Sequence, residues 1–406
     1  MKKTLFLLLF FLSIQLFSQI EIKGQVTSIT DQPLAHVSVY LNNTTIGTST
    51  KLDGRFKFQI DHGIYELIVS SLGYKTIHYP LITSKYNKSL TFKLSVEENV
   101  LSEVEIKKTR YNDEWKFNLN QFTTNFLGKT NLSKQCEIIN PKVLHFEFDK
   151  KTATLTATAR APLQIKHIGL GYHITFDLEQ FTLSQNRVHY LGFTKYKNLN
   201  GSKRKRKRWQ KNRLKAYYGS KMHFVRSLIN GTTKKEGFTI HFFRRELNPK
   251  RPTEEEINNA RKIVQFSGIN AVDFSKKITN PITKTDSSIV ILQKISLPKH
   301  IDYLYKQNVN QSEIVTKLGD KTQMSFKNHI SIIYSNEAEE DNFVMGPFGK
   351  RRQPLQVQTS SLIMFTKQVN LEKSGTISNP LDVFNEGYWA YEQFADALPL
   401  DFQPTN

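Results

Sequence analysis

Residues 20–96 alternate apolar and polar side chains in short runs, and this pattern constrains the fold more than any other feature of the chain. Alternation with a period of two predicts β-strands that bury one face. Turn residues interrupt the runs, among them Asp53-Gly54, a dipeptide typical of tight hairpins. The region therefore predicts a small module of β-strands, each with one buried face. Such a module binds or scaffolds, and it contains no recognisable reaction chemistry.

Several motifs follow one another in this region in a familiar order. They are Gly24-x-Val26, Pro33-Leu34-Ala35, Val37-x-Val39-x-Leu41, Gly47-Thr48-x-Thr50, Asp53-Gly54-x-Phe56 and Leu72-Gly73-Tyr74. In this order they resemble the carboxypeptidase regulatory-like domain, a transthyretin-like β-sandwich found at the front of outer-membrane receptors and secreted proteins of Gram-negative bacteria. The resemblance implies such a domain over residues 19–107, with 101–106 as the strand that follows the module in receptors.

Residues 1–18 have the composition of a secretory signal peptide. Lys2 and Lys3 precede an apolar run over 5–12, and cleavage is expected beside Ser18 or Gln19. The run is shorter than the roughly 20 apolar residues of a membrane span, and no cysteine follows it to carry a lipid anchor. An uncleaved amphipathic helix is the alternative, which the all-round apolar run disfavours. We expect an exported protein, in the periplasm or associated with the outer membrane, with no transmembrane helix after signal removal.

Residues 108–406 predict a larger domain of antiparallel strands and helices, so the fold class is α+β. Strands are expected at 144–148, 152–159, 163–168, 172–178, 188–191, 238–244, 288–297, 323–334 and 362–365. Helices are expected from an N-cap at Asp113 to Gly128, and at 209–229, 254–266 and 381–395. A capping-box pair, Thr253 and Glu256, opens the third of these helices.

The larger region also carries ordered motifs, among them Leu170-Gly171-Tyr172, Ala216-Tyr217-Tyr218-Gly219-Ser220 and Gly387-Tyr388-Trp389. They resemble a family of exported bacterial proteins that have the regulatory-like domain in front and no assigned activity. The resemblance supports the two-part architecture, and it transfers no activity to this chain.

The histidines do not supply a zinc-peptidase motif. A zinc carboxypeptidase uses His-x-x-Glu and a distant His, because three protein ligands leave one position open for water. None of the eleven histidines has Glu or His at the third following position, and His145-x-Glu147 comes nearest. Four acidic residues lack the central glycine of a calcium loop and are expected in a solvated loop: Glu337, Glu339, Glu340 and Asp341. We expect no metal site.

Other catalytic signatures are missing as well. The run 219–223 lacks the second glycine of a nucleophile elbow, and Ser220 and His223 are expected to be neighbours inside a helix. No phosphate-binding glycine loop or Rossmann fingerprint occurs, so no cofactor is expected. Cys136 is the single cysteine and is expected to be buried and unreactive. The sequence identifies no catalytic residue.

An unbroken basic run is the strongest charge feature of a chain whose net charge is +21. It consists of Lys203, Arg204, Lys205, Arg206, Lys207 and Arg208, with Trp209 beside it. Such a run is typical of nucleic-acid binding, which the predicted export argues against. An exported protein meets anionic lipid or acidic polysaccharide, where each basic residue contributes about 1 kcal/mol. The simpler interpretation of this run is a solvated loop that enters a helix. The functional prediction beside it is that these seven residues contact an anionic surface.

Three functional hypotheses follow. The first is a non-catalytic cell-envelope protein that binds or scaffolds through the sandwich and the basic loop. The second is an enzyme acting on envelope glycans or peptides through carboxylates that the sequence does not identify. It would require a pocket lined by paired Asp or Glu near a histidine. The third is an accessory partner of outer-membrane receptors.

Overall fold

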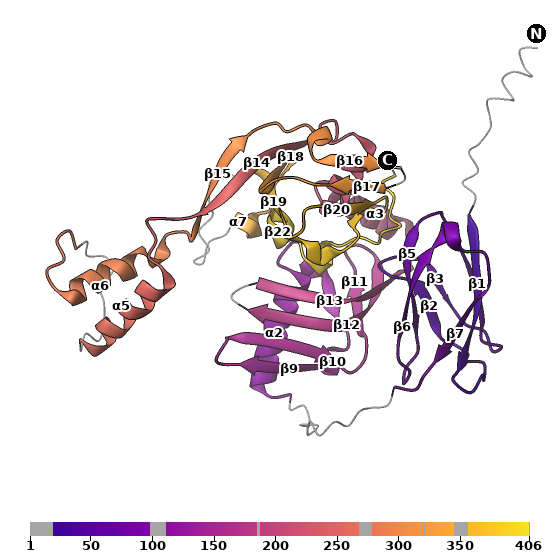
Figure 1. Cartoon of the computed structure of the whole chain (residues 1–406). Helices are drawn as coiled ribbons and strands as arrows, with labels where there is room; N and C mark the ends of the chain where they lie inside the picture. Colours follow the sequence, from indigo (N-terminus) through magenta and orange to yellow (C-terminus); the bar gives the residue numbers. More distant parts are fainter. Residues whose placement is uncertain are drawn as a thin grey trace, which may run out of the picture.

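The computed structural model describes residues 19–97, 111–184, 187–267, 278–319, 321–344 and 356–405. The predicted signal peptide and the predicted strand at 101–106 lie outside the described residues, as does the predicted domain boundary at 107. Figure 1 shows the N-terminal sandwich beside a sheet backed by α2, a second group of sheets above that sheet, and a projecting arm that carries α5 and α6. The predicted α+β class is confirmed.

The N-terminal region is a sandwich of a three-stranded sheet, β4-β1-β7, and a four-stranded sheet, β3-β2-β5-β6. The strands are β1 (Ile20–Ser28), β2 (Ser38–Leu41), β3 (Gly47–Ser49), β4 (Arg55–Ile60), β5 (Ile64–Ser70), β6 (Ile77–Ile82) and β7 (Leu90–Leu94). Period-two alternation buries Ile22, Val39 and Leu67 between the sheets. The pairs are antiparallel except β1 with β7.

Asp53-Gly54 forms a turn, but the hairpin expected there is wrong. The Gly54 amide donates to the Lys51 carbonyl over 2.9 Å, and Gly54 has a φ of +72°, which favours glycine. The strands on either side, β3 and β4, belong to different sheets. The turn therefore carries the chain from one layer of the sandwich to the other.

The next unit is a six-stranded antiparallel sheet. It contains β8 (Cys136–Ile138), β9 (Leu144–Asp149), β10 (Thr154–Ala159), β11 (Leu163–His167), β12 (Tyr172–Ser184) and β13 (Arg187–Asn198). One edge of β12 pairs with β13, and the other edge pairs with β11 and then with β10. Helix α2 (Asp113–Leu127) packs Phe122 and Phe126 into the core of this sheet, and its N-cap is Asn112 rather than Asp113. The predicted antiparallel strands are present, but the predicted meander is wrong, because β10 and β11 both pair with β12 and not with each other.

The long helix expected at 209–229 is two helices, α3 (Lys203–Tyr217) and α4 (Lys221–Asn230). Gly219 lies between them with a φ of +79°, and a Cβ there would stand 2.5 Å from Gln358 and 2.7 Å from Tyr334. Ser220 caps α4 by accepting a hydrogen bond from the backbone amide of His223. The apolar residues at spacings of three and four are therefore helical, but a tight turn divides the segment into two helices.

The C-terminal half contains a five-stranded antiparallel sheet, β15-β14-β18-β19-β22, and a four-stranded sheet, β16-β17-β20-β21. Their strands are β14 (Phe238–Leu247), β15 (His300–Lys306), β16 (Val315–Leu318), β17 (Lys321–Met324), β18 (His329–Ala338), β19 (Val357–Met364), β20 (Val369–Glu372), β21 (Thr376–Ile377) and β22 (Val383–Gly387). Helix α4 packs Phe224 and Leu228 into their shared core.

Three predicted elements of this half differ from the structure. The strand expected at 288–297 is helix α6 (Lys284–Gln293), which follows α5 (Glu254–Phe266) in the arm. The strand expected at 323–334 divides into β17 and β18. The helix expected at 381–395 is instead β22, the single-turn helix α8 (Tyr388–Tyr391) and the short helix η7 (Phe394–Asp396). No helix within the described ranges is both long enough and apolar enough to cross a membrane.

The sandwich is joined to the rest of the chain through the loop 42–45. The Asn43 amide donates to the Thr194 carbonyl over 2.8 Å, and the Thr44 carbonyl accepts from Tyr196 over 3.0 Å, so the loop extends the edge at β13. The Asp401 carboxylate accepts from the Thr45 amide over 2.9 Å and also from its hydroxyl. The sandwich tip is thus held by both β13 and the C-terminal segment.

Candidate functional site

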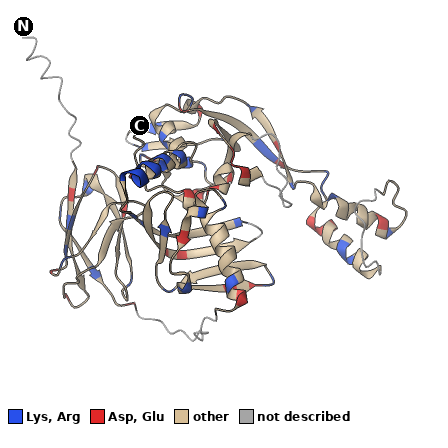
Figure 2. Ribbon diagram, turned by 180° about the vertical axis from the view of Figure 1, so that it is seen from behind, with Lys and Arg blue, Asp and Glu red and all other residues tan. Residues whose placement is uncertain are grey.

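The basic run forms the first turns of α3, so the loop expected for these residues is wrong. Ser202 is the N-cap, and its side chain accepts from the Lys205 amide over 3.4 Å. All six side chains from Lys203 to Arg208 are exposed, and in the described parts of the chain none of them forms an ion pair. Figure 2 shows the resulting cationic end of the helix.

The second half of α3 is fastened to the loop that precedes β12. Three side chains of α3 lie on one helix face, because they are three and then one position apart. Each donates a hydrogen bond of 2.8 Å to one of three successive carbonyls: Trp209 Nε1 to Ile168, Asn212 Nδ2 to Gly169, and Arg213 Nε to Leu170. The Arg213 guanidinium also stands over the Tyr172 ring, 3.9 Å from its centroid. The basic turns therefore extend from a firmly held helix.

Trp209 is an anchor and not part of the exposed surface that we predicted. Its side chain is 6% exposed. Two glycines make room for the indole, because a Cβ at Gly171 would lie 2.2 Å from it and a Cβ at Gly201 would lie 2.4 Å from it. The anionic-surface prediction consequently rests on the six cations, with Trp209 acting only through their placement.

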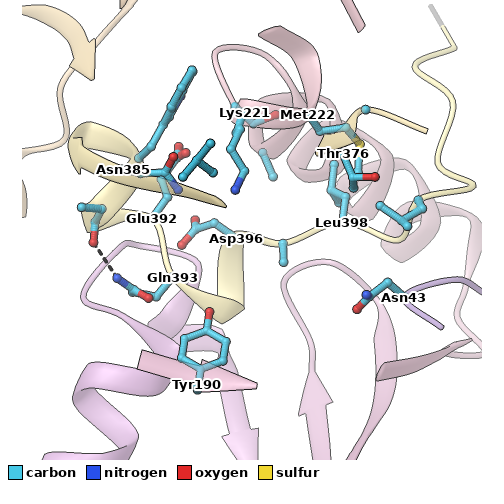
Figure 3. A pocket seen from close by; sticks show the side chains of 18 of the residues that line it. Asn43, Tyr190, Lys221, Met222, Thr376, Asn385, Glu392, Gln393, Asp396 and Leu398 are labelled. Carbon is cyan, nitrogen blue, oxygen red and sulfur yellow. Dashed lines mark hydrogen bonds between the residues drawn. The ribbon is translucent and has the colours of Figure 1, made fainter. Parts of the chain in front are cut away.

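A second group of charges lines a cavity of about 510 Å³. Its wall comes from β13, the start of α4, β22, α8, η7 and the C-terminal segment, with Asn43 contributed by the sandwich. Figure 3 shows Lys221 and Asp396 directed into the same space, with Glu392 beside them. Lys221 lies more than 170 positions before the two acidic residues in the chain, and no motif in the sequence identified the three.

Burial shifts the ionisation of all three groups. It raises the pKa of Asp396 to about 7, and the pKa of Glu392 well above its usual range with a further contribution from the neighbouring Asp396. It lowers the pKa of the Lys221 ammonium. Thr130 donates to Asp396 over 2.9 Å. Within the described ranges, no carboxylate lies at ion-pair distance from Lys221.

The acidic run, which begins inside β18 at Glu337, is not the solvated loop that we expected. Glu339 is 5% exposed. Glu340 accepts from the Asn131 amide over 2.9 Å and from the Tyr391 hydroxyl over 3.2 Å. Burial raises the pKa of Glu337, whose carboxylate accepts from Gln358. Asp341 begins the short helix α7 (Asp341–Val344). The run therefore adds negative charge behind Glu392 and Asp396.

The side chains that could resemble catalytic groups have structural partners. The Ser220 hydroxyl donates to the Tyr217 carbonyl over 2.6 Å, while the His223 ring bonds Glu236 over 3.3 Å. Burial raises the pKa of the Cys136 thiol to about 12, so it is unreactive at neutral pH. His145 lies 3.6 Å from Glu147 at an exposed position. The described residues contain no group of three or more ligands suited to a metal.

The enzyme hypothesis required a carboxylate pair near a histidine. The cavity supplies the pair, but no histidine of the described chain lines it. His167 stands behind it: its Nδ1 accepts from the Leu170 amide, so its Nε2 donates to the Ala395 carbonyl over 2.8 Å. Burial lowers the pKa of His167 to about 4. This ring fixes the backbone next to Asp396 and does not face the cavity.

Comparison with known families identifies the N-terminal module. Residues 22–106 match the family model of the CarboxypepD_reg-like domain, which confirms the predicted carboxypeptidase regulatory-like domain. No curated protein matches the chain. A solved structure from Bacteroides fragilis NCTC 9343, of a protein of unknown function provisionally described as membrane-associated, is 9% identical. The alignment covers 87% of this chain and 95% of that chain, with a TM-score of 0.16.

Proposed function

We propose that this protein is an exported, non-catalytic component of the cell envelope that binds anionic lipid headgroups through the basic turns of α3. The observation that supports this best is the row of six exposed cations, Lys203 to Arg208, on a helix whose other half is fastened by three side-chain hydrogen bonds. The regulatory-like domain that follows the predicted signal peptide supports placement in the envelope.

The position of these cations has a cost that an anionic partner would offset. The first turn of α3 contains no acidic residue. Positive side chains at a helix N-terminus oppose the helix dipole, and like charges four positions apart repel each other. An anionic surface reverses both effects, and contributes about 1 kcal/mol for each basic residue near it. Three of the six are arginines, which bind phosphate groups in a bidentate manner.

Sedimentation with lipid vesicles tests this function. The protein without residues 1–18 is mixed with phosphatidylcholine vesicles, with or without phosphatidylglycerol, at rising NaCl concentrations. We expect binding only to the anionic vesicles, and its loss as salt screens the charges. A variant with all six residues of the run changed to Gln should lose this binding.

A charge-matched control distinguishes local contact from net charge. Six exposed lysines of the sandwich are changed to Gln in that control: Lys23, Lys51, Lys57, Lys75, Lys85 and Lys88. It should bind like the unmodified protein. Equal binding by the α3 variant and the control would exclude the basic run as the contact. Competition by an acidic polysaccharide at matched charge concentration would instead assign the run to polysaccharide.

The contact with outer-membrane receptors remains a prediction from the domain family. A pull-down with detergent-solubilised receptors tests it, using the isolated sandwich only as a competitor of the whole chain. Retention of receptors by the whole protein would support an accessory role, and their absence from the eluate would exclude it.

A further inference from the structure

The cavity beside Lys221 has no part in binding a surface, yet it concentrates groups that are costly to bury without partners. Lys221 approaches from the start of α4, while Glu392 and Asp396 approach from the segment around η7. In the described chain, the Lys221 ammonium has neither a hydrogen bond nor an ion pair. Lys221 is half-buried, and a charge withdrawn from water to this extent is normally paired or neutralised.

We propose that this cavity binds a zwitterion, namely a short peptide with free ends, whose carboxylate faces Lys221 and whose ammonium faces Glu392 and Asp396. A ligand with both charges pairs with both sides of the cavity. A purely anionic ligand leaves the carboxylates without a partner, and a purely cationic ligand leaves Lys221 without one. A neutral sugar pairs with neither.

The rest of the wall is consistent with this ligand. A volume of about 510 Å³ is in the range of small-molecule sites, which are mostly apolar with a few polar groups. Tyr190 and Trp389 supply aromatic surface. Asn385 adds a polar side chain to the wall. Arg187, held over the Phe384 ring, adds a second cation.

The charged groups of the cavity come from different elements. The carboxylates belong to the segment around η7 and have further negative charge near them, because Glu340 acts on both Glu392 and Asp396. Arg187 and Lys221 come from β13 and α4. Among the described residues, no carboxylate lies at ion-pair distance from Lys221, so Lys221 is not already paired with the carboxylates of the cavity.

Calorimetric titration of the whole protein, without residues 1–18, tests the proposal with four probes. They are L-alanyl-L-alanine, its N-acetyl derivative, its C-terminal amide, and the peptide blocked at both ends. We expect the free dipeptide to bind at least about tenfold more tightly than either singly blocked form, and the doubly blocked form to bind most weakly. Blocking removes one charge at a time and changes nothing in the protein.

Variants then assign each end of the ligand. Lys221→Met should abolish the preference for the free dipeptide over its amide but keep the preference over the N-acetyl form. Glu392→Gln should do the reverse. Lys235→Met, at an exposed position away from the cavity, is the matched control and should behave like the unmodified protein.

Two results would overturn the proposal. One is the absence of saturable heat for the free dipeptide up to about 10 mM, which corresponds to binding too weak to be specific. The other is equal affinity for all four peptides, or a preference for a neutral disaccharide used as a fifth probe. Since the comparison among probes uses the unmodified protein, misfolding of a variant does not affect this outcome.

Discussion

The chain presents its charges in two different ways, at the basic end of α3 and in the cavity beside α4. The six cations of α3 are consecutive in the sequence and exposed on the surface. Lys221 lies more than 170 positions before Glu392 and Asp396 in the sequence, and the fold brings these three half-buried side chains together around a cavity. The first arrangement suits a broad anionic surface whose binding salt would weaken, whereas the second suits a small ligand with matched charges.

The two regions also depend on the fold to different degrees. The basic turns need only one helix and its anchor. The cavity needs β13, α4, β22, η7 and the tip of the sandwich to meet correctly. Changes that disturb the assembly of the domains should therefore affect peptide binding more than vesicle binding. The predictions below test that difference, from the largest expected effect to the smallest.

Replacement of Trp209 should have the largest effect, because the anchor of α3 would be lost. Trp209→Ala removes a buried indole and its hydrogen bond to Ile168, and should lower the free energy of unfolding by about 3–5 kcal/mol. Urea denaturation measures this change. Vesicle binding should weaken although all six cations remain. The exposed Lys207→Ala is the control, expected within about 0.5 kcal/mol of the unmodified protein.

The carboxylates of the cavity should make stability depend on pH. Because the folded-state pKa of Asp396 is raised to about 7, the folded protein binds this proton more tightly than the unfolded chain does. Stability from this group is present at low pH and is lost as pH rises towards and through 7, with a slope of at most about 1.4 kcal/mol per pH unit. Asp396→Asn should remove that slope.

The measurement is best made between about pH 4 and pH 7, because Asp396 binds its proton more tightly in the folded protein only between its unfolded and folded pKa values. His167, whose pKa is lowered to about 4, contributes stability that is lost as pH falls through about 6.5 to 4, so it gives a slope of opposite sign in the same window. His167 is present in both proteins, so the difference in slope between Asp396→Asn and the unmodified protein isolates Asp396. Asp61→Asn, at an exposed position, is the control. An unchanged slope in Asp396→Asn would mean that this carboxyl ionises without penalty in the cavity.

Loss of the contact between the domains should have a smaller effect on stability and a selective effect on binding. Asp401→Ala removes the acceptor for the Thr45 amide and hydroxyl, and should cost about 1–2 kcal/mol in unfolding free energy. Asn43, two residues away on the same loop, lines the cavity. Dipeptide affinity should therefore fall while vesicle binding stays constant. A parallel loss of both activities would show that the two regions are not independent.

Local signals in the sequence predicted the elements that depend on local structure. Alternation predicted the strands of the N-terminal region and of the sheet around β12, although not the order of that sheet. The capping box of Thr253 and Glu256 predicted α5 at its observed bounds. The strand expected at 288–297 was wrong because its branched apolar run outweighed a second capping box, formed by Thr283 and Asp286. That pair was a readable helix start, so α6 could have been predicted.

The cavity could not be predicted in the same way. Glu392 lies in the helix expected at 381–395 and Asp396 directly follows it, and no motif marks either residue. Their chemistry depends on burial against β13 and α4, which is a property of the tertiary structure. The anchoring role of Trp209 could not be predicted either, because an aromatic residue beside a basic run resembles a binding residue. Only the tertiary structure shows that the indole packs against Gly171 and Gly201.

The smallest effect is expected from a single charge reversal at the start of α3, and its sign is the informative result. Lys203 is the first residue of the helix and is exposed. An acid at that position interacts favourably with the helix dipole, so Lys203→Glu should raise the free energy of unfolding by about 0.5 kcal/mol at low salt, while it weakens vesicle binding. Urea denaturation at low and high salt measures the change.

Lys215 provides the matched comparison at the other end of the same helix. It lies in the last turn, 3.8 Å from Glu340, so Lys215→Glu should lower stability for the same electrostatic reason that Lys203→Glu raises it. High salt should reduce both differences. If Lys203→Glu destabilises the protein instead, the basic turns already have an anionic partner within the folded chain, and they are not free to bind an external surface.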